Sequence, residues 1–69
     1  MLIPIKTFYI KGTPSYDEIV EARGIAQQED CVVELRWQPH ILYGWCHEYI
    51  FSDSAPAEIY EKLPKVYGL

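Results

Sequence analysis

The alternation of apolar and polar residues along the chain predicts three β-strands. Residues 2–11, LIPIKTFYIK, are rich in β-branched and aromatic side chains, as strands usually are. Pro4 has no backbone N–H, so this strand lies at a sheet edge or begins at Ile5. Residues 31–38, CVVELRWQ, alternate apolar and polar side chains, which predicts a half-buried strand. A third strand is expected within residues 41–51, ILYGWCHEYIF.

Two further segments have the spacing of amphipathic helices. Ser15 and Glu18 form a capping box, in which each side chain bonds the backbone N–H of the other residue. The apolar positions that follow recur at helical spacing: Tyr16, Ile19, Val20, Ala22 and Ala26. A second, shorter helix is expected to begin within residues 54–56 and to end at Pro64.

These elements predict a single α+β domain over residues 1–69 with the order β-α-β-β-α. The helix between the first two strands makes them run in the same direction, and a hairpin makes the third run opposite to both. With the third strand in the centre, every neighbouring pair is antiparallel, which is the commoner arrangement. We therefore expect a three-stranded, mostly antiparallel sheet of order 1-3-2 with both helices on one face.

The register of the hairpin is open between two alternatives. A tight turn over residues 38–40 makes residues 41–43 part of the third strand and brings Cys31 opposite the neighbourhood of His47. A long loop over residues 39–44 places Trp37 opposite Cys46 and Cys31 near or beyond Phe51. The tight turn is favoured, because three apolar residues, ILY, are poorly placed in an exposed loop.

The same alternation predicts which side chains enter the core. Large aromatic residues of the hairpin are expected beneath the helices, namely Trp37, Trp45, Tyr49 and Phe51, with His47 beside them. The opposite face, without helices, then carries Val32, Glu34, Arg36, Cys46, Glu48 and Ile50. Such a face is more apolar than a solvated sheet usually is, and this favours contact with another chain.

The net charge and the distribution of charged residues favour some classes of binding partner over others. The formal net charge is −4, and the six basic residues are scattered: Lys6, Lys11, Arg23, Arg36, Lys62 and Lys65. Nucleic acids are bound by clustered Lys and Arg, so direct nucleic-acid binding is disfavoured, including single-strand binding on the sheet. The acidic residues of the two helices favour a protein with a basic surface: Asp17, Glu18, Glu21, Glu58 and Glu61. No apolar run is long enough to span a membrane and no secretory leader is evident, so a cytoplasmic protein is expected.

Four residues have side chains that can bind zinc: Cys31, His40, Cys46 and His47. Their spacing argues against a site, because the only close pair, Cys46 and His47, is adjacent in a strand and points to opposite faces. Because their side chains point to opposite faces, Cys46 cannot act as a nucleophile with His47 as its base. No sequence motif of a nucleophilic or nucleotide-binding enzyme is present. We expect neither enzymatic activity nor a cofactor. A metal or thiol site built from Cys31, Cys46 and His47 remains an alternative.

The sequence therefore predicts a small non-enzymatic protein-interaction module. An acidic inhibitor or regulator of a larger nucleic-acid-processing protein, of the kind that phages and mobile elements encode, fits its size and charge. A homodimer joined through the bare sheet is the alternative. The partner-binding residues expected are those of the acidic helices and of the bare face: Asp17, Glu18, Glu21, Glu58, Glu61, Val32, Glu34, Arg36, Glu48 and Ile50.

Overall fold

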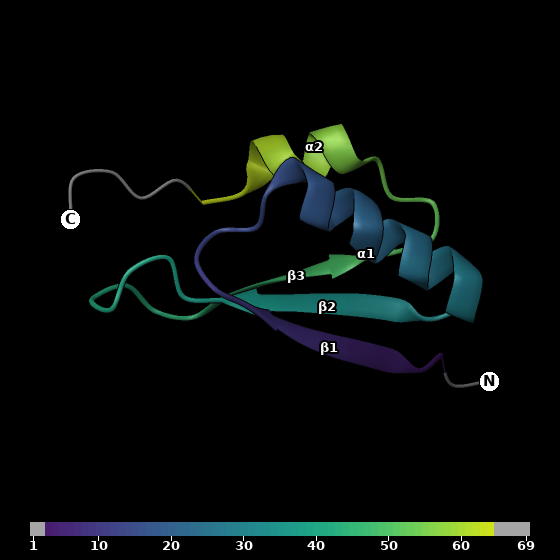
Figure 1. The fold of residues 1–69 in the computed structure, drawn as a ribbon, viewed down its shortest axis with the longest axis horizontal. Coiled ribbons are helices and arrows are strands. Elements are labelled where there is room, and N and C mark those ends of the chain that lie inside the picture. Colours follow the sequence, from purple (N-terminus) through teal and green to yellow (C-terminus); the bar gives the residue numbers. More distant parts are fainter. Residues whose placement is uncertain (1–2, 65–69) are drawn as a thin grey trace.

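Five elements follow one another in the order expected from the sequence (Figure 1). The structure is a computed structural model and describes residues 3–64; residue 2 of the expected first strand and both ends of the expected 1–69 domain lie outside this range. The elements are strand β1 (Ile5–Ile10), helix α1 (Tyr16–Glu29), strands β2 (Val32–Trp37) and β3 (Cys46–Ile50), and helix α2 (Pro56–Lys62). The α+β class is confirmed.

The sheet is mixed, with β2 in the centre. β1 pairs with β2 in parallel, and β3 pairs with the other edge of β2 in the antiparallel sense. The expected strand order 1-3-2 and the mostly antiparallel sheet are therefore wrong. A central strand is covered by a neighbour on each edge, and the segment VVELRW has the apolar content for that position: five of its six residues are buried.

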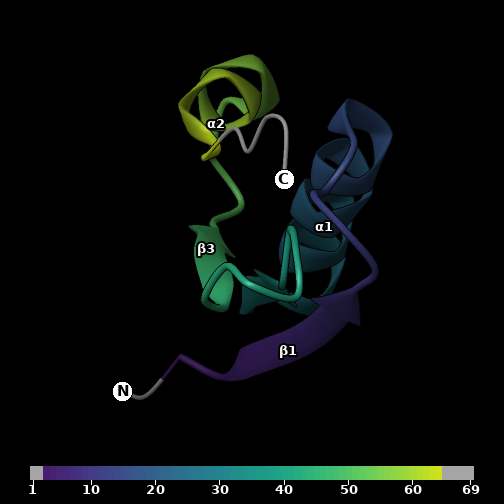
Figure 2. The ribbon, with the colours of Figure 1, turned by 90° about the vertical axis from the view of Figure 1, so that its left-hand side faces the viewer.

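Both helices lie on the same side of the sheet, as expected (Figures 1 and 2). The capping box of α1 is present: Ser15 Oγ accepts from the Glu18 N–H at 3.2 Å, and Glu18 Oε1 accepts from the Ser15 N–H at 2.8 Å. α2 has no side-chain cap and begins with Pro56, whose missing N–H would be unpaired there in any case. Tyr16 of α1 and Tyr60 of α2 contact each other edge to face, with ring centroids 6.0 Å apart.

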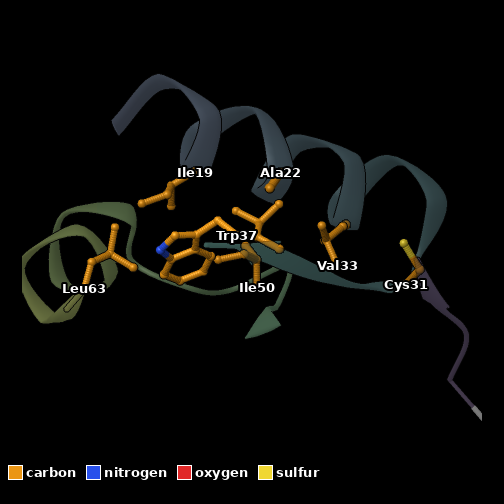
Figure 3. Close-up of a cluster of buried hydrophobic side chains, with 9 residues drawn as sticks. Ile19, Ala22, Cys31, Val33, Trp37, Ile50 and Leu63 are labelled. Carbon is orange, nitrogen blue, oxygen red and sulfur yellow. The ribbon is translucent and has the colours of Figure 1, made fainter. Parts of the chain in front are cut away.

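The core is a single cluster between α1, the central strand and the C-terminal end of α2 (Figure 3). Trp37 lies at its centre and is 0% exposed. The other buried members are Ile19, Ala22, Ala26, Cys31, Val33, Leu35, Ile50 and Leu63. The indole Nε1 of Trp37 is buried and has no hydrogen-bond acceptor among the described residues.

The hairpin between β2 and β3 is a long loop of eight residues, 38–45. The favoured tight turn is therefore wrong. The loop has bonds of its own: Gln38 Nε2 donates to the Tyr43 carbonyl at 3.0 Å, and the Leu42 N–H donates to His40 Nδ1 at 3.1 Å. Its apolar residues Ile41 and Leu42 project into solvent. Hydrogen bonds within the loop thus stabilise it, although the apolar residues 41–43 had favoured the tight turn.

The register that results reverses the expected faces of β3. Trp37 lies opposite Cys46 and Val33 lies opposite Ile50, so Cys46, Glu48 and Ile50 share the helix-covered face with Trp37. Trp45, His47, Tyr49 and Phe51, which were expected in the core, alternate onto the other face and are exposed. The alternation of a strand has a period of two residues, so a shift of one residue in the register exchanges the two sets.

Candidate interaction surface

The face of the sheet that carries no helix is lined by aromatic and apolar side chains. Pairing in register places on it Ile5, Thr7 and Tyr9 from β1, Val32, Glu34 and Arg36 from β2, and His47 and Tyr49 from β3. Trp45 and Phe51 flank β3 with the same alternation, and Ile3 precedes β1. We call this set the helix-free face. Six large apolar residues of this set are exposed: Ile3, Ile5, Tyr9, Trp45, Tyr49 and Phe51.

Glu34 is at the centre of this face and is only 6% exposed. Its Oε1 accepts from Thr7 Oγ1 at 2.9 Å, and its Oε2 accepts from Arg36 Nε at 3.1 Å and lies 3.1 Å from His47 Nδ1. An ionised carboxylate only accepts hydrogen bonds, so a hydrogen bond here requires His47 Nδ1 to be the donor. One residue of each strand thus contacts the same carboxylate.

These contacts stabilise the charged form of Glu34. The hydrogen bonds from His47 and Thr7, followed by that from Arg36, lower the pKa of the carboxyl from 4.5 to about 2, although burial acts in the opposite direction. The same pairing with Glu34 raises the pKa of the Arg36 guanidinium. Arg36 is thus a permanent cation whose Nε is oriented by a buried anion.

Tyr9, Arg36 and Trp45 lie side by side at one end of the helix-free face. The rings of Tyr9 and Trp45 meet edge to face, with centroids 6.1 Å apart and planes at 90°. With Cys46 and His47 these three residues line a hollow of about 470 Å³. Tyr9 is 69% and Trp45 63% exposed, so the pair presents aromatic surface to solvent on a scaffold of hydrogen-bonded strands.

Only part of the expected bare-face set lies on this surface. Val32, Glu34 and Arg36 do so, although the first two are buried within it. Glu48 and Ile50 were placed on the wrong face: Ile50 is fully buried in the core, and Glu48 is half-buried beneath the helices. The reversed register of β3 is the reason in both cases.

The acidic residues lie on the opposite side of the molecule, on the two helices: Asp17, Glu18 and Glu21 on α1, and Glu58 and Glu61 on α2. They do not form one patch with the helix-free face. Glu18 and Glu21 line a groove beside β1, which Glu58 and Glu61 do not. The expected partner-binding residues thus lie on two different sides of the sheet.

Cys31, Cys46 and His47 are not brought together. Cys31 precedes β2 and Cys46 lies opposite Trp37 at the far end of that strand, six residues away, or roughly 20 Å. Cys46 is on the helix-covered face and His47 on the helix-free face. Over residues 3–64, no three His, Cys, Asp or Glu side chains are placed to hold one metal ion. Both cysteines are free thiols.

Trp45, His47, Tyr49 and Phe51 were missed as surface residues because they were assigned to the core. The signal that identifies them is the long-loop register, in which Trp37 faces Cys46. That pairing alone places the even-numbered residues of β3 with Trp37 and leaves the aromatic ones outside.

None of the described helices is long and apolar enough to cross a membrane. The chain matches no protein-family model, no curated protein and no solved structure.

Proposed function

We propose that this chain is a non-enzymatic interaction module that binds another protein through its helix-free face. The observation that carries the proposal is the group formed by Tyr9, Arg36 and Trp45, which are exposed and line one hollow, with the two aromatic rings edge to face. Tyrosine, tryptophan and arginine are the residues most enriched at the energetic centres of protein interfaces.

The scaffold behind these side chains supports the proposal. Arg36 is oriented by its bond to Glu34, and Tyr9 and Trp45 restrain each other. Side chains that are already ordered lose less conformational entropy when a partner covers them, so more of the contact energy appears as affinity. The four residues Thr7, Glu34, Arg36 and His47 form a network that links the three strands beneath the contact surface.

Charge favours a protein over a nucleic acid as the occupant of this face. Arg36 is the only Lys or Arg among the strand residues of the face, and Glu34 balances its charge. Surfaces that bind single strands by stacking also need basic residues that follow the phosphates. The acidic charge lies on the helical side and favours a partner that also has a basic region, as nucleic-acid-processing proteins do.

The test is affinity capture from the native host with matched surface variants. Trp45→Ala and Tyr9→Ala each remove one member of the aromatic pair, and Leu42→Ala removes an even more exposed apolar side chain from the 38–45 loop. We expect the unmodified chain and Leu42→Ala to retain the same protein, and both aromatic variants to lose it, because truncating such a residue weakens binding by about 2 kcal/mol or more.

Photocrosslinking then locates the contact, with benzoylphenylalanine in place of Tyr49 or of Leu42. Crosslinks to the captured protein from position 49 only support the proposal. A partner that all variants retain, or one that crosslinks only from the loop, contradicts it. Crosslinks between two copies of this chain replace the proposed partner with a homodimer.

A further inference from the structure

β1 is the least covered strand of the sheet. Helix α1 lies closest to β2 and β3 and farther from β1, although it connects β1 to β2. Five of the six residues of β1 are exposed, and they include residues from both faces of the strand. Phe8, on the helix side, is still 37% exposed. β1 also has no neighbour on its outer edge among the described strands. One edge and both faces of a strand are thus open to solvent.

The outer edge of β1 has backbone groups free to pair. The Pro4 carbonyl accepts from the Val32 N–H at 3.0 Å, so Pro4 directs its backbone toward β2. Successive residues of a strand direct their backbone groups to opposite edges, so Ile5, Thr7 and Tyr9 present N–H and C=O groups to the outside. The missing N–H of Pro4 belongs to the inner edge and does not block pairing at the outer one.

A groove of about 210 Å³ runs between this strand and α1. Glu18 and Glu21 of α1 line it together with apolar residues, namely Phe8, Ile10, Ala22, Ile25 and Leu35. Glu21 is exposed, whereas Glu18 is partly occupied by its cap to Ser15. The groove therefore combines apolar contact area with negative charge along the open edge of a strand.

An ion pair within the chain shows how a basic residue on a strand contacts the acidic residues of α1. Lys6, on the helix side of β1, forms an ion pair with Glu29 in the last turn of α1. Glu29, Ile25, Glu21 and Glu18 follow one another along the same side of α1 at helical spacing. A lysine or arginine on a strand added beside β1, level with Phe8 or Ile10, lies one strand spacing farther from α1 than Lys6 does, and its long side chain can extend toward Glu21 and Glu18.

We propose that the outer edge of β1 binds an extended, basic segment of a partner protein by strand addition, with alternate Lys or Arg side chains directed toward Glu18 and Glu21. This inference goes beyond the proposed function and does not depend on it, because it uses the edge of β1 and the helix side of the sheet. Main-chain bonds to Ile5, Thr7 and Tyr9 supply affinity, and the groove supplies selectivity.

A second copy of this chain fits the edge less well. It brings a second net charge of −4, and pairing two β1 edges places two acidic α1 helices on the same side of one continuous sheet. The only cation of β1, Lys6, is already paired with Glu29 in each copy. Charge complementarity therefore favours a basic partner over self-association.

The test uses the full chain and a defined probe, a capped octapeptide of alternating lysine and valine. Comparison peptides have alternating glutamate and valine, or the same lysines and valines in two blocks. Two more peptides have the alternating lysine sequence with every second backbone amide N-methylated. One carries the methyl groups on the odd-numbered amides and the other on the even-numbered ones. Backbone amide NMR shifts during titration locate the contact, and amide hydrogen exchange reports new bonds at the β1 edge.

We expect the alternating lysine peptide to shift amides of β1 and α1 and to protect those of Thr7 and Tyr9. One N-methylated phase should bind and the other should not, because only alternate amides of an added strand face β1. Glu21→Lys should weaken binding about fivefold, since it replaces an exposed attraction by a repulsion. Glu61→Lys, with the same charge change on α2, should weaken it less than about twofold.

Several outcomes would overturn the inference. These are no binding at millimolar peptide, equal binding of the glutamate or block peptide, equal binding of both N-methylated phases, or equal effects of Glu21→Lys and Glu61→Lys. Dimerisation of the free chain with protection of Thr7 and Tyr9 would assign the edge to a second copy instead. Variants of Trp45 leave this edge intact, so failure here is distinguishable from failure of the proposed function.

Discussion

Trp37 lies directly opposite Cys46 in the antiparallel pair of β2 and β3. This single pairing places Ile50 in the core with Val33 and directs Trp45, His47 and Tyr49 to the helix-free face. The aromatic surface of the protein follows from the register of one hairpin. The two tryptophans consequently have opposite environments, one at the centre of the core and one in solvent.

The fluorescence of the two tryptophans tests this assignment. We expect Trp45→Phe, which leaves only Trp37, to emit at short wavelength and to be poorly quenched by acrylamide, because Trp37 is fully buried. Trp37→Phe should leave an emission that is red-shifted and readily quenched. Equal quenching of the two variants, with both folded by circular dichroism, would contradict the register.

The same two positions should differ in their effect on stability. Trp37→Ala opens a cavity in the core cluster of the described residues and is expected to cost about 3–5 kcal/mol, enough to unfold a domain of this size. Trp37→Phe should cost much less, because it keeps most of the apolar contacts and removes a buried N–H that has no acceptor among the described residues.

Trp45→Ala serves as the control in urea unfolding and should change the free energy of unfolding by no more than about 0.5 kcal/mol. A cooperative transition of unchanged midpoint for Trp37→Ala would be inconsistent with its place in the core.

Glu34 should make stability depend on pH in the acid range. Its pKa is lowered to about 2 in the folded chain, so its contribution is fully present above the usual value of 4.5 and is lost as pH falls from there toward 2. We expect the melting temperature of the unmodified chain to decrease over that window. Glu34→Gln should be less stable at pH 7 and should flatten this part of the profile.

Glu61→Gln removes an exposed carboxylate of the same charge and should leave the acid profile parallel to that of the unmodified chain. If Glu34→Gln also gives a parallel profile, the contacts with Thr7, Arg36 and His47 do not stabilise the folded state.

The two thiols should react at different rates with a disulfide reagent. Cys46 is half-buried, whereas Cys31 is buried at the start of β2. Accessibility is a main determinant of thiol reactivity, so one fast and one slow reaction are expected. Cys46→Ser should abolish the fast phase and Cys31→Ser should retain it. The reverse assignment would contradict the hairpin register.

Local features of the fold could be predicted from the sequence because short-range interactions decide them. The capping box of Ser15 and Glu18 joins residues three apart, and the alternation from Val33 to Trp37 is a property of one strand. The capping box is found as predicted, and Val33, Leu35 and Trp37 share the core face, but five of the six residues of β2 are buried where a half-buried strand was predicted. The separation of Cys46 from His47 follows from their adjacency in a strand and needs no knowledge of the partner strands.

The order of the strands was decided by tertiary packing. Parallel and antiparallel pairs differ little in stability per residue, so a general preference for antiparallel neighbours could not outweigh the burial of VVELRW in the centre of the sheet. The position of α1 over β2 and β3 is equally non-local, and it is what leaves the groove beside β1 open.

The composition of the candidate surface depends on the register of the β2–β3 hairpin, which the sequence did not determine. Trp45, His47, Tyr49 and Phe51 alternate with Cys46, Glu48 and Ile50, and each set is compatible with the core in size or in apolar character. The sequence by itself determined that one of the two sets would be exposed. Only the tertiary structure decided which, because a shift of one residue in the hairpin exchanges every side chain between the buried face and the open one.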